Sequence, residues 1–265
     1  MINPPVRCRL LAVLFVGGSF LLFAESSIAQ TPEPALVVKE TEVWDHDGNV
    51  VGKAAKGDVL EVLIGGNKGL ITAGGPREAV SISSEHLVHP RGAAGKALLD
   101  ELIVAGSTNP EHYHLRADNR MFSKDYEGMV ADLTRAIELA PQDTRGYLSR
   151  AQAWMRVKKY DAALADLQEV SCIDPEQRPK TFNGLLRAYA AQEDWQRVVE
   201  VYTEKLEEGK RYGDGFRSHN LAGRAAAYEA LEQYEMAKAD YTSALESNPR
   251  NREAAAGLKR IDEKK

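Results

Sequence analysis

The chain has 265 residues, of which 43% are hydrophobic and 28% are charged, and its formal net charge is −5. These values are ordinary for a globular protein with a hydrophobic core. The acidic balance argues against a general nucleic-acid binder, which would carry a basic surplus.

The first 29 residues have the pattern of a secretory signal peptide. Arg7 and Arg9 precede an apolar run from Leu10 to Phe23, and the small residues Ser27 and Ala29 stand where signal peptidase reads. We expect cleavage after Ala29 and export to the periplasm, the cell envelope or the medium, with an uncleaved anchor as the alternative. No later run is long and apolar enough to predict a membrane span after cleavage.

Residues 30–34 are expected to be a linker, and residues 35–91 a small all-β domain. Short runs rich in Val and Ile alternate with glycine-rich turns, a pattern typical of strands. The expected strands are Leu36–Lys39, Val50–Lys53, Val59–Ile64, Gly69–Thr72 and Ala79–Ser83.

This β region resembles a bacterial SH3-like domain in Gly52 and in the segment Lys56–Val62. The resemblance implies a small barrel that binds cell-wall material or peptide. Residues 33–91 hold only one aromatic residue, Trp44, and this does not favour a groove for proline-rich peptides, which needs several aromatic walls.

From Gly92 onward the apolar spacing becomes helical and an internal repeat appears. Pro141 and Pro175 end equivalent units, and Pro249 ends the last. A period of this length predicts a stacked repeat architecture. We expect a helical half-repeat or linker over 92–109, a six-residue insertion around Tyr212–Gly215 and a capping helix over 252–265. The four repeats between them are expected at 110–143, 144–178, 179–212 and 218–251.

The unit resembles the tetratricopeptide repeat, which places small or bulky apolar residues at fixed positions. The second repeat matches it with Tyr147, Ala151, Trp154, Ala163, Leu167, Val170 and Pro175. The fourth repeat matches it with Leu221, Ala225, Tyr228, Ala237, Tyr241, Ala244 and Pro249. Arg120 departs from the pattern in the first repeat. The third repeat departs at position 27, where Lys205 replaces alanine, and it has no closing proline.

The resemblance implies an all-α superhelix of helix-turn-helix units whose first helices line a concave groove. In this reading the chain is a non-enzymatic scaffold that binds a protein or peptide, possibly with acidic groups. The alternative function is a cell-wall or glycan binder that acts through the β domain. The expected groove residues are Arg145, Gln152, Arg156, Lys180, Asn183 and Arg187, with a merely solvated face as the competing interpretation.

Arginine recurs at position 7 and aspartate at position 23 of the first, second and fourth repeats, whereas the third repeat has Leu185 and Val201 there. Because the two residues occur together or not at all, we expect ion pairs within each unit that serve the framework. The pairs are Arg116 with Asp132, Arg150 with Asp166, and Arg224 with Asp240.

The sequence predicts no catalytic residues, no metal site and no cofactor. His86, His89, His112 and His114 lie near one another, but no His-Glu-x-x-His motif or paired cysteines accompany them. In the segment Asp45–Asn49 the glycine is misplaced for a calcium loop, and the twelfth position would be Lys56 instead of a carboxylate. After cleavage Cys172 is the sole cysteine, so no internal disulfide is expected.

Overall fold

The computed structural model describes residues 11–15, 33–45, 50–62, 70–73, 80–83 and 87–263. It divides into two compact units, Met1–Asp125 and Tyr126–Lys265. The division falls inside the first expected repeat rather than at the end of the β region. None of the described helices is long and apolar enough to cross a membrane.

The first unit contains one eight-stranded sheet with the order β4-β3-β7-β6-β1-β5-β2-β8. Its strands are β1 (Leu11–Phe15), β2 (Glu33–Val37), β3 (Thr41–Asp45), β4 (Val50–Ala54), β5 (Val59–Val62), β6 (Leu70–Ala73), β7 (Val80–Ser83) and β8 (Leu87–Val88). All pairings are antiparallel except that of β1 with β5.

All five expected strands are present with shifted ends, while β1, β3 and β8 were not expected. β3 escaped prediction because its apolar residues are interrupted by charged ones. The expected turns at Asp47–Gly48, Gly65–Asn67 and Gly74–Pro76 lie outside the described residues. β1 lies within the expected signal peptide, so a chain cleaved after Ala29 would lack it. The SH3-like barrel stays a prediction.

Helices α1 (Ala93–Val104) and α2 (Pro110–Ser123) complete the first unit. Leu36 of β2 and Leu99 of α1 are fully buried and belong to one apolar cluster with Leu98 and Leu115. The strands and both helices therefore share a core, since burial of these side chains stabilises them together.

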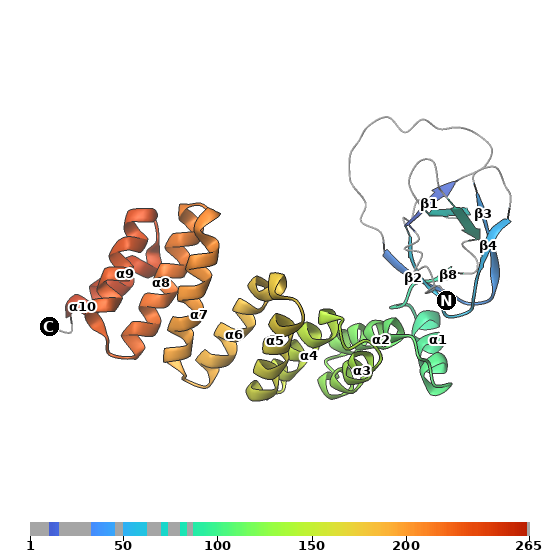
Figure 1. Cartoon of the computed structure of the whole chain (residues 1–265), viewed down its shortest axis with the longest axis horizontal. Coiled ribbons are helices and arrows are strands. Elements are labelled where there is room, and N and C mark those ends of the chain that lie inside the picture. Colours follow the sequence, from blue (N-terminus) through green and yellow to red (C-terminus); the bar gives the residue numbers. More distant parts are fainter. Residues whose placement is uncertain are drawn as a thin grey trace, which may run out of the picture. The chain divides into compact units, whose positions relative to one another are not determined.

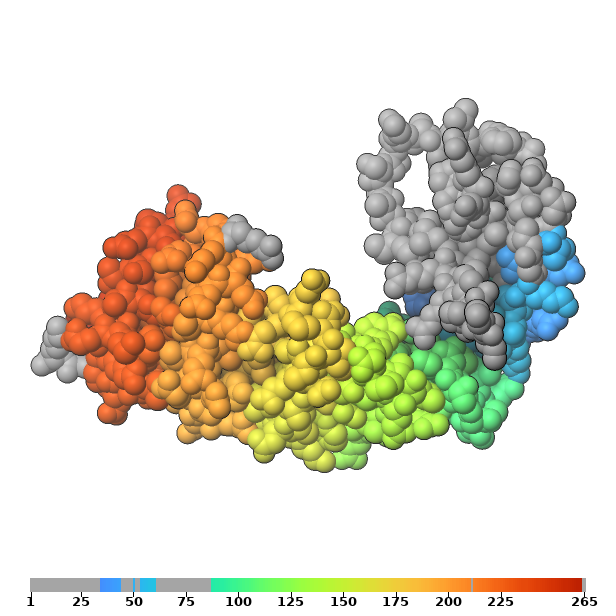
Figure 2. Space-filling view, in the orientation of Figure 1, coloured from blue at the N-terminus to red at the C-terminus, as the bar shows by residue number. Residues whose placement is uncertain are grey.

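The second unit is a succession of antiparallel helices, each in contact with the next (Figure 1). They are α3 (Tyr126–Leu139), α4 (Thr144–Arg156), α5 (Tyr160–Ile173), α6 (Arg178–Ala191), α7 (Trp195–Glu208), α8 (Asp214–Ala230), α9 (Tyr234–Ser247) and α10 (Arg252–Glu263). Figure 2 shows the same succession of helices in a space-filling view, from α6 in yellow to α10 in red. The short 3₁₀ helix Gly209–Arg211 precedes the expected insertion. From Asp214 onward the inserted residues form the start of α8, which has 17 residues.

The repeat register is visible in the backbone. Lys124, Lys158, Glu193 and Glu232 have φ between 59 and 61°, and each lies in the turn between the two helices of one repeat. A left-handed residue ends a helix in a tight turn. The same turn therefore recurs at the same repeat position in all four units.

The small residues at positions 8 and 20 of the second and fourth repeats are buried. Ala151, Ala163, Ala225 and Ala237 are exposed by 2% or less, which lets the two helices of a repeat approach closely. Glycine lets the aromatic residues of one repeat reach the next: a Cβ on Gly223 would stand 2.4 Å from the Tyr202 ring, and a Cβ on Gly257 would stand 2.2 Å from that of Tyr241. Each repeat thus buries its apolar side chains against the next repeat, as in repeat proteins generally.

Candidate partner-binding face

Six expected groove residues lie on the first helices of the second and third repeats, and all six are exposed: Arg145, Gln152, Arg156, Lys180, Asn183 and Arg187. We call this set the basic face. In each helix its members are spaced to fall on one side. Because α4 and α6 are equivalent helices of successive repeats, both present the same repeat positions to the surroundings.

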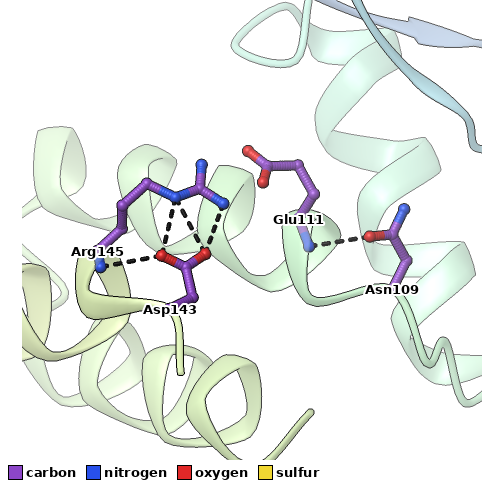
Figure 3. A network of polar contacts seen from close by, with 4 residues as sticks. All are labelled: Asn109, Glu111, Asp143 and Arg145. Carbon is purple, nitrogen blue, oxygen red and sulfur yellow. Dashed lines mark hydrogen bonds and ion pairs between the residues drawn. The ribbon is translucent and has the colours of Figure 1, made fainter. Parts of the chain in front are cut away.

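Arg145 is committed to the start of its own helix. Asp143 caps α4 by accepting from the backbone N–H of Arg145, and its carboxylate accepts from the Arg145 guanidinium at 2.7 Å (Figure 3). In the first unit, the Asn109 side chain caps α2 in the same way by accepting from the N–H of Glu111 (Figure 3). The charge of Arg145 is therefore partly offset by Asp143.

The cations farther along the two helices differ from Arg145. In the described part of the chain, Arg156 and Arg187 form no ion pair, and Lys180 donates only to the side-chain amide of Gln177, at 3.2 Å. These cations can therefore interact with an incoming anion without first breaking a salt bridge.

Lys205 of α7 joins this face, although sequence reasoning did not include it. Its ammonium group donates to Oδ1 of Asn183 at 3.0 Å and lies 5.9 Å from the centre of the Phe216 ring. Burial lowers the pKa of Lys205. The signal that could have found it is the departure at position 27, where the other repeats bury a small residue.

The arginine–aspartate pairs of the second and fourth repeats lie where the register predicts. Arg150 donates through two nitrogens to both carboxylate oxygens of Asp166, at 2.7 and 3.0 Å. Arg224 does the same with Asp240, at 2.7 and 2.9 Å. These bonds raise the pKa of each arginine. Two parallel hydrogen bonds of this kind fix direction as well as charge.

Each of these two arginines also reaches the preceding repeat. Arg150 donates to the Thr134 hydroxyl at 3.0 Å, and Arg224 to the Thr203 hydroxyl at 3.1 Å. We call Arg150 and Arg224 the bridging arginines, because each connects three helices from two consecutive repeats. Their donors are used within the fold, which favours the framework role over ligand contact.

Arg116 forms an ion pair with Asp100 of α1 at 3.1 Å, a partner that the register did not predict. Asp100 lies in the helix before the first repeat, at the position that corresponds to Thr134 of the first repeat and Thr203 of the third. The expected pair of Arg116 with Asp132 would join the two units and stays a prediction. Asp132 itself is 2% exposed.

The C-terminal helix α10 is held by a polar network. Arg260 donates to the Glu229 carboxylate of α8 at 2.9 Å, and the hydroxyl of the buried Tyr241 donates to the same carboxylate at 3.1 Å. Burial, together with the Glu229 charge, raises the pKa of Tyr241 to about 12. Glu229 therefore anchors α10.

Two of the four histidines that lie near one another in the sequence have structural partners in the first unit. Nε2 of the buried His112 lies 2.6 Å from the carbonyl oxygen of Gly57, and its Nδ1 lies 2.8 Å from the Ser107 hydroxyl. His89 accepts from the N–H of Arg91 through Nδ1. His86 lies outside the described residues. Within the ranges described, no three His, Cys, Asp or Glu side chains come together as metal ligands would.

Comparison with known proteins agrees with this geometry. Residues 219–251 match a family model described as tetratricopeptide repeat. Small glutamine-rich tetratricopeptide repeat-containing protein 2 of Mycosarcoma maydis is 29% identical over 97 residues, which are 37% of this chain and 27% of that protein. The protein of the same name from Saccharomyces cerevisiae is 31% identical over 100 residues, which are 37% of this chain and 28% of that protein.

Solved structures show the same architecture. YrrB, described as a TPR protein with an unusual peptide-binding site, is 13% identical with a TM-score of 0.52 and covers 63% of this chain and 82% of its own. The apo form of RapI is 12% identical with a TM-score of 0.55 and covers 64% of this chain and 54% of its own.

This chain has a tetratricopeptide-repeat fold. The chain spans little more than a quarter of the curated relatives, so their whole-protein activities do not transfer to it.

Proposed function

We propose that this tetratricopeptide-repeat chain is an exported, non-enzymatic scaffold that binds an extended protein or peptide segment with acidic groups along the basic face. The observation that carries the proposal is the group of exposed cations on α4 and α6, in which Arg156 and Arg187 have no carboxylate partner among the described residues. Such charges mainly steer and orient a bound segment.

The peptide-binding neighbour YrrB supports a peptide as the ligand class, because its fold is shared with this chain. Export is proposed from the leader pattern of residues 1–29.

A quadruple variant tests the proposal: Arg145, Arg156, Lys180 and Arg187 all replaced by alanine. The probe is a synthetic peptide of alternating glycine and aspartate, capped at both ends. We expect the variant to weaken binding by about two orders of magnitude, because each charge-assisted hydrogen bond contributes roughly 1.5–3 kcal/mol before screening. Calorimetry or fluorescence anisotropy measures the affinity.

The matched control replaces Arg135, Arg197, Lys210 and Lys259, four exposed cations outside the basic face. It removes the same net charge, so a general electrostatic effect would weaken both variants equally. Equal affinities of wild type and the basic-face variant would contradict the proposal.

A further inference from the structure

Position 27 of the third repeat is unlike that of the other repeats. Ala136, Val170 and Ala244 occupy it elsewhere with at most 1% exposure, whereas Lys205 is a long, charged side chain that is only partly buried. A half-buried ammonium group loses hydration that only hydrogen bonds or an opposite charge can replace.

Within the protein, the Lys205 ammonium group has few interactions that replace its hydration. Lys205 donates to one neutral amide oxygen, and in the part of the chain that the structure describes it forms no ion pair with a carboxylate. Burial alone accounts for its lowered pKa, with no neighbouring carboxylate to raise it. Lys205 is thus a charged side chain without a carboxylate partner at a position where the other repeats bury an uncharged one.

The surroundings hold Lys205 against α6. Phe216, from the extra turn of α8, packs on Gly209, where a Cβ would come 2.1 Å from the ring. The Phe216 face lies within reach of a cation–π contact with Lys205, at 5.9 Å. The insertion that lengthens α8 therefore supplies one wall of the Lys205 environment.

The contact with Lys205 also determines what Asn183 can offer. Because Oδ1 of Asn183 accepts from Lys205, the amide NH₂ remains a donor. Lys180 and Arg187, three residues before and four after Asn183 on α6, lie on the same side of the helix. The four side chains together provide donors and positive charge, which suit a carboxylate.

We propose that Lys205 and Asn183 form an anchoring site for one carboxylate of the bound segment, with Lys180 and Arg187 as flanking cations. The inference rests on the proposed function and adds the residue that selects the anion. The carboxylate comes from an acidic side chain or from the end of a peptide chain.

The test replaces Lys205 by methionine, which keeps the length and removes the charge. We expect binding of the capped glycine–aspartate peptide to weaken about tenfold while the melting temperature stays the same or rises. A merely structural lysine would give the opposite combination, a lower melting temperature with unchanged affinity, and that result would overturn the inference. Lys205→Arg should restore part of the affinity because it keeps the charge.

Lys210→Met is the control, since Lys210 is exposed and carries the same charge; its affinity should stay within about twofold of wild type. A second probe of alternating glycine and asparagine with a free C-terminal carboxylate distinguishes the two sources. Loss of affinity for either probe in Lys205→Met supports the anchor and identifies its ligand.

The outcomes separate the two proposals. If the basic-face variant loses binding and Lys205→Met keeps it for both probes, only the anchor is overturned. If wild type binds neither probe, the acidic-segment function and the anchor are both overturned.

Discussion

The second and fourth repeats differ from the third in how the first helix is held. Arg150 and Arg224 join three helices each through carboxylate and hydroxyl acceptors. In the third repeat, Leu185 and Val201 take the two positions of the pair and are 4% and 6% exposed. An ion pair and an apolar pair thus occupy equivalent positions in repeats of the same fold. This agrees with the general finding that a buried ion pair contributes little more to stability than a hydrophobic contact of similar volume.

The comparison also separates framework from function. In the second and fourth repeats, the charge of the bridging arginine is neutralised by an aspartate of the same repeat. The third repeat has no such pair, and its one anomalous charge, Lys205, lies beside the exposed residues of α6. The charges that recur in register are paired within the framework, and the irregular charge is the one proposed to hold the partner.

The largest expected effect comes from breaking one pair. Arg150→Leu leaves the Asp166 carboxylate, which is 6% exposed, without its cation, and should lower the free energy of unfolding by about 3 kcal/mol. Arg150→Leu combined with Asp166→Val, which copies the third repeat, should recover most of that loss. Chemical denaturation of both variants measures it. Equal or additive losses would mean that the two kinds of pair are not interchangeable.

A smaller effect isolates the bond to the preceding repeat. Thr203→Val removes the hydroxyl that accepts from Arg224 and should lower the free energy of unfolding by about 1 kcal/mol. Thr242→Val is the matched control, because Thr242 makes the same hydroxyl bond to the carbonyl four residues back as Thr203 does. The difference between the two denaturation midpoints reports the contribution of the bond from Arg224 to Thr203. Equal midpoints would mean that this bond does not stabilise the fold.

The smallest effect should come from installing the pair where it is missing. Leu185→Arg with Val201→Asp gives the third repeat the same two residues, but Gln168 stands where Thr134 and Thr203 accept in the other repeats. We expect the stability to change by less than about 1 kcal/mol, since pair and apolar contacts nearly balance. A large loss in thermal denaturation would show that the local packing of the third repeat is specialised.

The repeats could be predicted closely from the sequence, and the partners of individual charges only in part. The burial of Tyr241 and of Ala151 follows from the repeat period, because both residues stand at repeat positions that pack against a neighbouring helix. The bridging arginines were paired correctly within their repeats because two residues that vary together in register indicate contact. The Thr134 and Thr203 acceptors were missed, since their hydroxyls lie in a different repeat from the arginine.

The candidate site shows the same limit. The exposure of Arg156 and Arg187 follows from their helix positions. The ion pair of Arg145 with Asp143 does not follow from the sequence, because the same pattern fits an arginine that points to solvent and one that pairs with the N-cap residue. The bond between Glu229 and Arg260 likewise depends on how α10 packs.

By itself the sequence determined the repeat family, its register and the side of each helix that meets solvent, because these depend on local periodicity and on small residues at fixed spacing. Only the tertiary structure decided that Arg116 pairs with Asp100, that β1 and β3 join the sheet, and that Lys205 contacts Asn183 and lies near the Phe216 ring. Those contacts join segments far apart along the chain or displaced by the insertion, and no local pattern encodes such distances.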